Sequence, residues 1–229
     1  RWIMENEAIV NTFFGLNVYR KKIENEDEKI ASYVESFVKE KNGVTVAVTD
    51  NEGYTVNTDS KDDNLHDNKK YSSLFAKIKI CILDFINTRG YNLDKFDIHM
   101  TKTWATYTEK NQKIGAHKHT ASHYSFVYYL RNIEGMGNIK FEKDASQNAL
   151  LIPPTEEYFS NWNQFNFSSY TVPVSTGDFI IFPSELPHHT EINTTDQARI
   201  SISGDILLTM KPGVKALPCI PHPSGWLTI

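Results

Sequence analysis

Apolar and polar residues alternate with a period of two through much of the chain from residue 96 onward. The segment 96–101, for example, reads Phe-Asp-Ile-His-Met-Thr, and such alternation is typical of a strand with one buried face. Turn residues separate this segment from further β candidates, and no helical pattern intervenes. A run of seven or eight strands of this kind predicts an antiparallel sandwich or jelly roll. Beyond the strand that begins at 96, strands are expected over 116–132, 137–142, 147–152, 170–174, 178–183 and 198–209.

Two segments before residue 96 have helical periodicity instead. Residues 26–41 and 70–89 each place their large apolar side chains on one stripe, and Gly43 and Gly90 follow as stop signals. We expect helices over both segments. Neither helix contains residues that suggest chemistry, so their expected role is to cover one face of the sheet.

The other segments have weaker patterns. Residues 8–20 and 44–48 are β candidates, and 50–69 is a polar stretch rich in Asp, Asn and Lys that is expected to form a loop. Residues 153–169 form a long aromatic and polar loop, and such loops on all-β scaffolds often serve as lids or substrate walls. The tail 211–226 contains four prolines and is expected to pack outside the core as irregular chain.

The length of 229 residues suits one large domain. We expect a single domain over 1–229 with three regions. Residues 1–95 are predicted to form a supporting region of helices and strands. Residues 96–210 are predicted to form a jelly-roll core, which the motifs described below make the candidate catalytic region, and 211–229 the proline-rich tail.

Composition and charge narrow the class of protein. The hydrophobic content of 40% and charged content of 23% are ordinary for a globular protein. The formal net charge of −4 argues against a general nucleic-acid binder. The two cysteines, Cys81 and Cys219, do not suggest a disulfide framework, and Cys81 lies in an apolar run. No apolar run reaches the ~18 residues of a membrane span, and no signal peptide is visible, so a cytoplasmic location is expected.

Three histidines form the first candidate site. His117 and His119 are two residues apart on an expected strand, so their side chains project to the same face. Two imidazoles at this spacing can take adjacent positions on one metal ion, although a surface strand can also carry two histidines by chance. His188 follows the expected strand 178–183 and is a candidate for a third ligand. We interpret the three as one divided metal site.

Two further residues suggest an anion site beside the metal. Arg199 and Ser201 lie two apart on an alternating strand, and the face that they share is expected to look into the barrel. A buried arginine needs an anionic partner. Its planar fork suits a carboxylate that binds through both oxygens. The pair therefore indicates binding of an acidic co-substrate.

Taken together, these segments resemble the iron(II)- and 2-oxoglutarate-dependent oxygenases, and in particular a bacterial and phage subgroup with His-x-His in place of His-x-Asp. The resemblance covers roughly residues 96–208 and implies a double-stranded β-helix core of the jelly-roll or cupin-like type. As a set the motifs are specific, whereas each alone is weak. They are His117-x-His119, Ser125-Phe-Val-Tyr-Tyr-Leu130, Gly137-x-Ile139-x-Phe141, Phe182-Pro-Ser-x-Leu-Pro-His188 and Arg199-Ile-Ser-Ile-Ser.

The resemblance also implies a role for each candidate residue. The three histidines would hold Fe(II). Arg199 would pair with the distal carboxylate of the co-substrate 2-oxoglutarate, helped by the hydroxyl of Ser201, with Tyr129 and Tyr107 as further candidates. Oxidative decarboxylation with O2 would give succinate and carbon dioxide and oxidise a primary substrate.

The sequence departs from the usual pattern at position 119, where most of the superfamily has Asp or Glu. Three neutral imidazoles leave the site one unit more positive than two histidines and a carboxylate would. Binding is not abolished, because imidazole suits several divalent metals. Two alternatives stay open: His119 does not ligate, or the site is a three-histidine cupin-like centre in which Arg199 binds another anion.

Two neighbouring histidines have alternative interpretations. His189 adjoins His188, and neighbours on an extended segment point in opposite directions, so only one of the two can ligate. We choose His188, because it follows Pro187 as in the family-like Leu-Pro-His. His123 either lines the substrate pocket or is an ordinary polar residue of its strand.

The function predicted from these residues is that of a dioxygenase, and most specifically a hydroxylase of an unknown peptidyl or small-molecule substrate. A metal-binding jelly-roll protein without catalysis is one alternative. A three-histidine cupin-type dioxygenase that does not use 2-oxoglutarate is another. The expected partners are 2-oxoglutarate and O2, with nucleic acid disfavoured by the acidic charge and no membrane partner. An edge strand or the proline-rich tail is a candidate surface for a homodimer.

Overall fold

The structure of the protein is a computed structural model that describes residues 17–23, 28–41, 54–56, 64–143, 159–162, 166–214 and 219–228. Two α-helices precede most of the strands: α1 spans Glu28–Lys41 and α2 spans Ser72–Thr88. Single turns of 3-10 helix occur at η1 (Leu65–Asp67), η2 (Lys69–Tyr71) and η4 (Pro223–Gly225). Within this part of the chain, no helix is long and apolar enough to cross a membrane.

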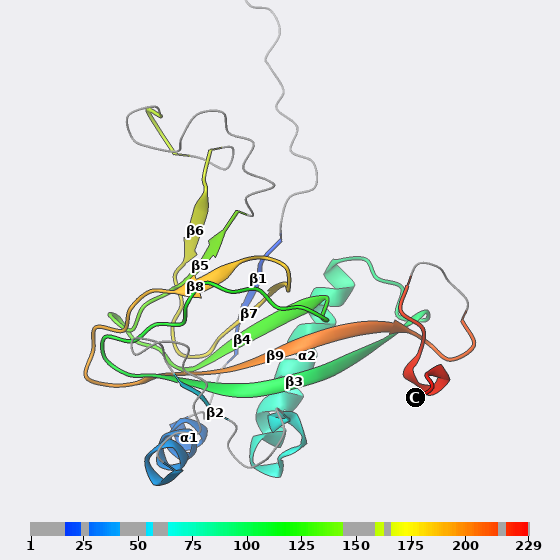
Figure 1. The fold of residues 1–229 in the computed structure, drawn as a ribbon, viewed down its shortest axis with the longest axis horizontal. Coiled ribbons are helices and arrows are strands. Elements are labelled where there is room, and N and C mark those ends of the chain that lie inside the picture. The colour runs from blue at the N-terminus through cyan, green and yellow to red at the C-terminus, as the bar shows by residue number, and fades with distance from the viewer. Residues whose placement is uncertain are drawn as a thin grey trace, which may run out of the picture.

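The described strands form two antiparallel sheets (Figure 1). The larger sheet has six strands in the order β1-β7-β4-β9-β3-β2, and the smaller has three in the order β6-β5-β8. All the pairings between these strands are antiparallel. The strands are β1 (Tyr19–Lys22), β2 (Tyr54–Val56), β3 (Phe96–Thr108), β4 (Tyr124–Arg131), β5 (Ile139–Glu142), β6 (Ser169–Val172), β7 (Asp178–Pro183), β8 (His188–Thr190) and β9 (Arg199–Met210).

Period-two alternation divides the core into two apolar clusters on opposite faces of the large sheet. On β4, Phe126 and Tyr128 join the cluster formed with α1 and α2, whereas Tyr129 joins the cluster shared with the small sheet. On β7, Phe179 belongs to the helix side and Phe182 to the small-sheet side. One face of the large sheet is therefore sealed by helices, and the other faces the small sheet.

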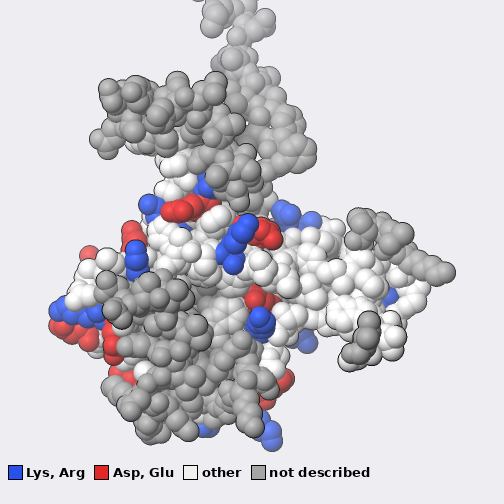
Figure 2. Space-filling model, in the orientation of Figure 1, with Lys and Arg blue, Asp and Glu red and all other residues white. Residues whose placement is uncertain are grey.

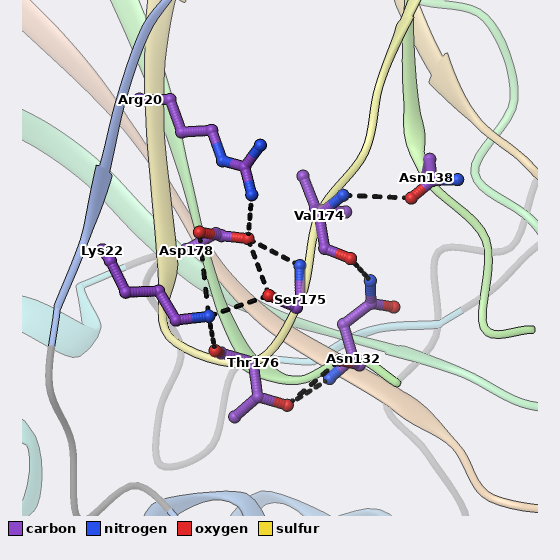
Figure 3. A network of polar contacts seen from close by, with 8 residues as sticks. All are labelled: Arg20, Lys22, Asn132, Asn138, Val174, Ser175, Thr176 and Asp178. Atoms are coloured by element: carbon purple, nitrogen blue, oxygen red, sulfur yellow. Dashed lines mark hydrogen bonds and ion pairs between the residues drawn. The ribbon is translucent and has the colours of Figure 1, made fainter. Parts of the chain in front are cut away.

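A buried carboxylate fixes the edge of the large sheet. Asp178 begins β7 and is 2% exposed, and its carboxylate accepts hydrogen bonds from Arg20 of β1 at 2.8 Å and from the backbone N–H of Ser175 at 2.6 Å (Figure 3). Beside it, the side-chain amide of Asn132 donates to the carbonyl of Val174 at 2.7 Å. This network joins β1 to the turn before β7, so that the edge strand is held by side chains as well as by its ladder.

The structure confirms a mainly β fold with helices on one sheet and corrects several predicted elements. The expected strand 116–132 is wrong in its first part, because β4 begins only at Tyr124. Ala121 has a positive φ of 61°, which interrupts an extended strand at that point. The expected loop 50–69 contains β2, which pairs with β3. The segment β8 was not predicted as a strand.

Other predicted elements agree with the structure or lie outside its described residues. The predicted helices 26–41 and 70–89 correspond to α1 and α2. The β candidates 44–48 and 147–152 lie outside the described residues, as does most of 8–20. Of the loop 153–169, the structure describes residues 159–162 and 166–169.

Candidate active site

A pocket of about 420 Å³ lies between the two sheets, lined by β3, β4 and β9 on one side and by β8 on the other. Its floor follows from the register of the three central strands. Four residues of β9, two apart from one another, face the same way: Arg199, Ser201, Ser203 and Asp205. Because side chains alternate along a strand, the apolar residues between them face the helices instead. The floor is thus a polar stripe about four residues long across an otherwise apolar sheet.

Neighbouring strands extend this stripe sideways. On β3, Thr106 is paired with Ser201 and Trp104 with Ser203, and both β3 residues line the pocket. On β4, Tyr129 is the partner of Ser201. The floor of the pocket therefore runs from the guanidinium of Arg199 at one end to the carboxylate of Asp205 at the other.

Three histidines meet above this floor. His117, His119 and His188 each offer one ring nitrogen, and these three atoms lie within 4.8 Å of one another. His117 and His188 are held opposite each other by two backbone hydrogen bonds, of 3.0 and 2.9 Å. The segment that carries His117 and His119 is therefore extended enough to project both rings together, although it lies outside β4.

In each of the three rings, the Nδ1 atom forms a hydrogen bond with an oxygen atom of the protein. The Nδ1 atoms of His117 and His188 lie 2.8 and 2.9 Å from the backbone carbonyl oxygen two residues earlier. The Nδ1 atom of His119 lies 2.6 Å from the carboxylate of Asp205. A carbonyl or carboxylate oxygen accepts, so each Nδ1 carries the proton and each Nε2 carries the lone pair. Imidazoles fixed in this tautomer by an outer partner are the usual state of histidine ligands to a metal.

His188 lies deeper in the protein than the other two histidines. It is 4% exposed, whereas His117 is exposed at the mouth of the pocket. Burial lowers the pKa of His188 to about 3, and the nearby imidazole of His117 adds to the effect. At neutral pH the ring of His188 is uncharged, which is the form that can donate a lone pair to a metal.

The depressed pKa of His188 predicts that the metal-free protein loses stability in acid. The unfolded chain binds a proton at His188 below about pH 6.5, whereas the folded chain resists protonation until about pH 3. The free energy of unfolding should therefore fall, by up to about 1.4 kcal/mol per pH unit, as the pH drops from 6.5 towards 3. Denaturant titrations at pH 7.5, 6.5 and 5.5 measure the slope. His188→Gln should flatten it, and an equal slope in both proteins would contradict this origin.

Arg199 is a buried cation that has only neutral acceptors among the described residues. It is 2% exposed, and burial lowers the pKa of its guanidinium. Its Nη2 atom donates to the hydroxyl of Thr190 at 2.7 Å and lies 3.5 Å from that of Thr108. Its Nη1 atom donates to the carbonyl of Met136 at 2.8 Å and lies 3.2 Å from that of Glu191. Within the described chain no carboxylate pairs with it, so its charge is left for a ligand in the pocket.

The backbone around Arg199 is built to let the guanidinium lie close. Gly137 has a φ of +87°, and a Cβ there would come within 2.6 Å of the carbonyl oxygen of Glu191 and 3.1 Å of Arg199 Nη1. A side chain at this position would be strained and would push against the acceptors that hold the arginine. The absence of a side chain at Gly137 is therefore part of how the guanidinium is positioned.

The other predicted co-substrate residues are placed differently from one another. Ser201 and Tyr129 both line the pocket with Arg199. Tyr129 is 1% exposed, and burial raises the pKa of its hydroxyl to about 12. Tyr107 lies on the opposite face of β3 from Thr106 and lines a separate cavity with Arg131. The structure does not bring Tyr107 into the site, because its position along β3 has the wrong parity.

The remaining histidines are also placed. His189 lies at the pocket wall, with its Nδ1 atom 3.4 Å from the carboxylate of Glu142. His123 accepts a hydrogen bond from the backbone N–H of Leu208 at 3.1 Å, and burial lowers its pKa. His123 is not among the residues that line the pocket.

Sequence reasoning missed three contacts of this site. Asp205 lies against His119, Thr190 against Arg199, and Trp104 stacks on His119 with the ring centroids 5.5 Å apart. Asp205 follows Arg199 by six residues on β9 and therefore shares its face. This spacing was the one signal in the sequence for the contact between Asp205 and His119. The other two depend on which strands lie next to each other.

Comparison with known proteins gives a family match for part of the chain and structural matches for its fold. Residues 102–205 match the family model described as "Putative 2OG-Fe(II) oxygenase". No curated protein matches the chain in sequence.

Solved structures match over most of the chain at low sequence identity. The α-ketoglutarate-dependent epimerase SnoN from nogalamycin biosynthesis has a TM-score of 0.59 at 14% identity, covering 90% of this chain and 91% of its own. A Pseudomonas putida prolyl-4-hydroxylase has 0.55 at 12% identity, covering 84% and 92%. HygX from Streptomyces hygroscopicus, solved with nickel and 2-oxoglutarate bound, has 0.52 at 12% identity, covering 83% and 82%. These likenesses establish the double-stranded β-helix fold.

The fold and the pocket define a jelly-roll protein with a candidate metal centre and an anion-binding arginine. Residues 102–205, somewhat under half of the chain, are similar to the 2OG-Fe(II) oxygenase family. Fe(II) and 2-oxoglutarate are the metal and the co-substrate of this family, as its description states. The donor set fits both, since three lone-pair nitrogens converge at one end of the pocket and a buried guanidinium lies at the other.

Proposed function

We propose that the chain is a hydroxylase that inserts one oxygen atom into a C–H bond of its primary substrate. The proposal rests above all on one observation. A buried guanidinium with only neutral partners in the described chain shares a pocket with three converging imidazoles. A closed, purely structural metal site would have no use for the arginine.

In this proposal, His117, His119 and His188 hold Fe(II) through their Nε2 atoms. The hydrogen bonds at Nδ1 fix the tautomer and orientation of each ring before the metal arrives, which reduces the cost of ordering the site. Three ligands leave coordination positions for the co-substrate and for O2, as catalytic metal sites require.

Arg199 then binds the distal carboxylate of 2-oxoglutarate. Ser201, two residues further along the same face of β9, lines the pocket and would donate its hydroxyl to that carboxylate, and Tyr129 beside it on β4 would do the same. The strand β8 links the two halves of the site, because His188 and Thr190 are two residues apart and Thr190 holds the guanidinium. The distance between metal and carboxylate is thus set by one short strand.

When bound, Fe(II) and 2-oxoglutarate would supply the oxidation by O2, in which 2-oxoglutarate, O2 and the substrate C–H bond become succinate, carbon dioxide and a C–OH group. The protein residues supply geometry and the exclusion of water. Trp104 stacks on His119 and shields that side of the pocket. Hydroxylation requires no general acid or base from a protein side chain. For this reason we prefer it to reactions that require such a group.

The primary substrate is proposed to be a peptidyl residue or a small molecule. The pocket is of the size of ordinary small-ligand sites, about 420 Å³, and has to hold 2-oxoglutarate as well. On the face drawn in Figure 2, the described basic and acidic residues are interspersed and form no continuous basic stripe. This distribution and the net charge of −4 both argue against a nucleic-acid substrate.

Turnover with Fe(II), 2-oxoglutarate and O2 tests the proposal. Succinate should form at a rate that depends on all three, and a library of peptides and small metabolites should reveal a product heavier by one oxygen atom. A product of unchanged oxygen content would assign another reaction of this family. No succinate above a metal-free control, with every library member, would contradict the proposed activity.

A further inference from the structure

Asp205 is the outer partner that distinguishes His119 from the other two candidate ligands. Asp205 is 6% exposed, and its carboxylate lies 2.6 Å from His119 Nδ1. Among the described residues no lysine or arginine forms an ion pair with it. A carboxylate buried without such a partner is costly unless a strong hydrogen bond or a metal centre compensates for it.

The carboxylate is itself held in place. Ser125 of β4 donates its hydroxyl to the same Oδ1 atom at 2.8 Å. The Oγ atom of Ser184 lies 2.9 Å from that of Ser125 and accepts from the hydroxyl of Ser122 at 2.8 Å. These serines come from two segments of the chain, 122–125 and the residue after β7. The position of Asp205 is therefore fixed independently of His119.

The contrast with the other two histidines is one of charge. His117 and His188 direct their Nδ1 atoms at neutral backbone carbonyls, whereas His119 alone faces an anion. His119 is also the residue that stands where most of the superfamily has a carboxylate ligand. The negative charge that a carboxylate ligand would supply is thus carried by Asp205, which lies behind the imidazole of His119.

We propose that Asp205 is a positioning residue that fixes the ring of His119 and, through it, returns to the metal centre the negative charge lost by having histidine at position 119. A charge-assisted hydrogen bond to Nδ1 makes the imidazole a stronger electron donor at Nε2. Asp205 thereby sets the affinity of the site for Fe(II). This inference rests on the proposed metal ligation by His119.

Metal binding in matched variants tests the inference. Asp205→Asn keeps an acceptor for His119 but removes the charge, and Asp205→Ala removes both. Glu142→Gln is the control, because Glu142 faces His189, the neighbour that is not a proposed ligand. Anaerobic titration with Fe(II) should show about 10-fold weaker binding for Asp205→Asn, a loss towards about 100-fold for Asp205→Ala, and less than about 2-fold change for Glu142→Gln.

A spectroscopic measurement separates charge from mere structure. The charge-transfer absorption of the anaerobic complex with Fe(II) and 2-oxoglutarate depends on the electron density at the metal. It should move to shorter wavelength in Asp205→Asn, stay in place in Glu142→Gln, and return towards the wild-type position in Asp205→Glu, which restores the charge. Circular dichroism of each metal-free variant shows whether it folds. If Asp205→Asn fails to fold, the comparison of Asp205→Glu with the wild type decides instead.

The outcomes also separate this inference from the proposed site. If His119→Ala loses Fe(II) binding while both Asp205→Asn and Asp205→Ala bind within about 2-fold of the wild type, the inference is wrong and the site stands. If His119→Ala itself binds Fe(II) as the wild type does, the ligand assignment is wrong, and the inference falls with it.

Discussion

Replacing His188 with alanine should abolish turnover, with a loss of at least about 100-fold in affinity for Fe(II). Even outer partners of metal ligands typically change affinity by about 10- to 100-fold, and a ligand itself should contribute more. His188 is the most buried of the three rings, and its neutral state at pH 7 is secured by burial. Isothermal titration under anaerobic conditions, together with succinate formation, measures both losses.

His189→Ala is the matched control for this variant. It removes an imidazole from the adjacent position of the same strand, but one that is oriented to Glu142. We expect it to keep Fe(II) affinity within about 3-fold of the wild type, well short of the 10-fold effect of an outer metal partner. Loss of metal in His189→Ala with retention in His188→Ala would show that the neighbour is the ligand.

Replacing Arg199 with alanine should raise the KM for 2-oxoglutarate by roughly 30-fold or more while metal affinity changes little. Truncating one partner of a buried charge pair costs about 2 kcal/mol or more, which corresponds to that factor. Arg199 is 2% exposed and touches none of the three histidines through a hydrogen bond. Steady-state kinetics at varied 2-oxoglutarate, with saturating Fe(II), measures the change.

Arg199→Lys should recover only part of this loss, because an ammonium group cannot form the two parallel hydrogen bonds of a guanidinium. Ser203→Ala is the control. Ser203 lies on the same face of β9, two residues beyond Ser201, and this change should leave the KM for 2-oxoglutarate nearly unchanged. Oxygenase activity that persists in Arg199→Ala without any dependence on 2-oxoglutarate would favour the three-histidine cupin-type dioxygenase instead.

Much of this arrangement could be predicted from local pattern. The alternation along 198–209 placed Arg199 and Ser201 on one face, and the structure places both in the pocket. The stripes of 26–41 and 70–89 predicted the two helices. Local periodicity determines which way a side chain points once the strand is right, and these segments are long enough for the period to be clear.

What escaped prediction depended on partners far apart in the sequence. The strand β8 is only three residues long, and it exists because His188 pairs with Phe141 of β5. The segment before β4 was predicted as regular strand, but it is held by an isolated bridge from His117 to His188. The resemblance implied Tyr107 as a co-substrate residue, but Tyr107 lies on the opposite face of β3 from Thr106, which lines the pocket. No local pattern in the sequence reveals such pairings.

We expect one pocket to bind a metal through three imidazoles and a dicarboxylate through one guanidinium. A crystal structure of the protein grown without oxygen, with Fe(II) and 2-oxoglutarate and with anomalous data at the iron edge, tests it most directly. We predict one iron bound by Nε2 of His117, His119 and His188, with a carboxylate of 2-oxoglutarate on Arg199. Iron bound elsewhere, or 2-oxoglutarate that leaves Arg199 without contact, would contradict it.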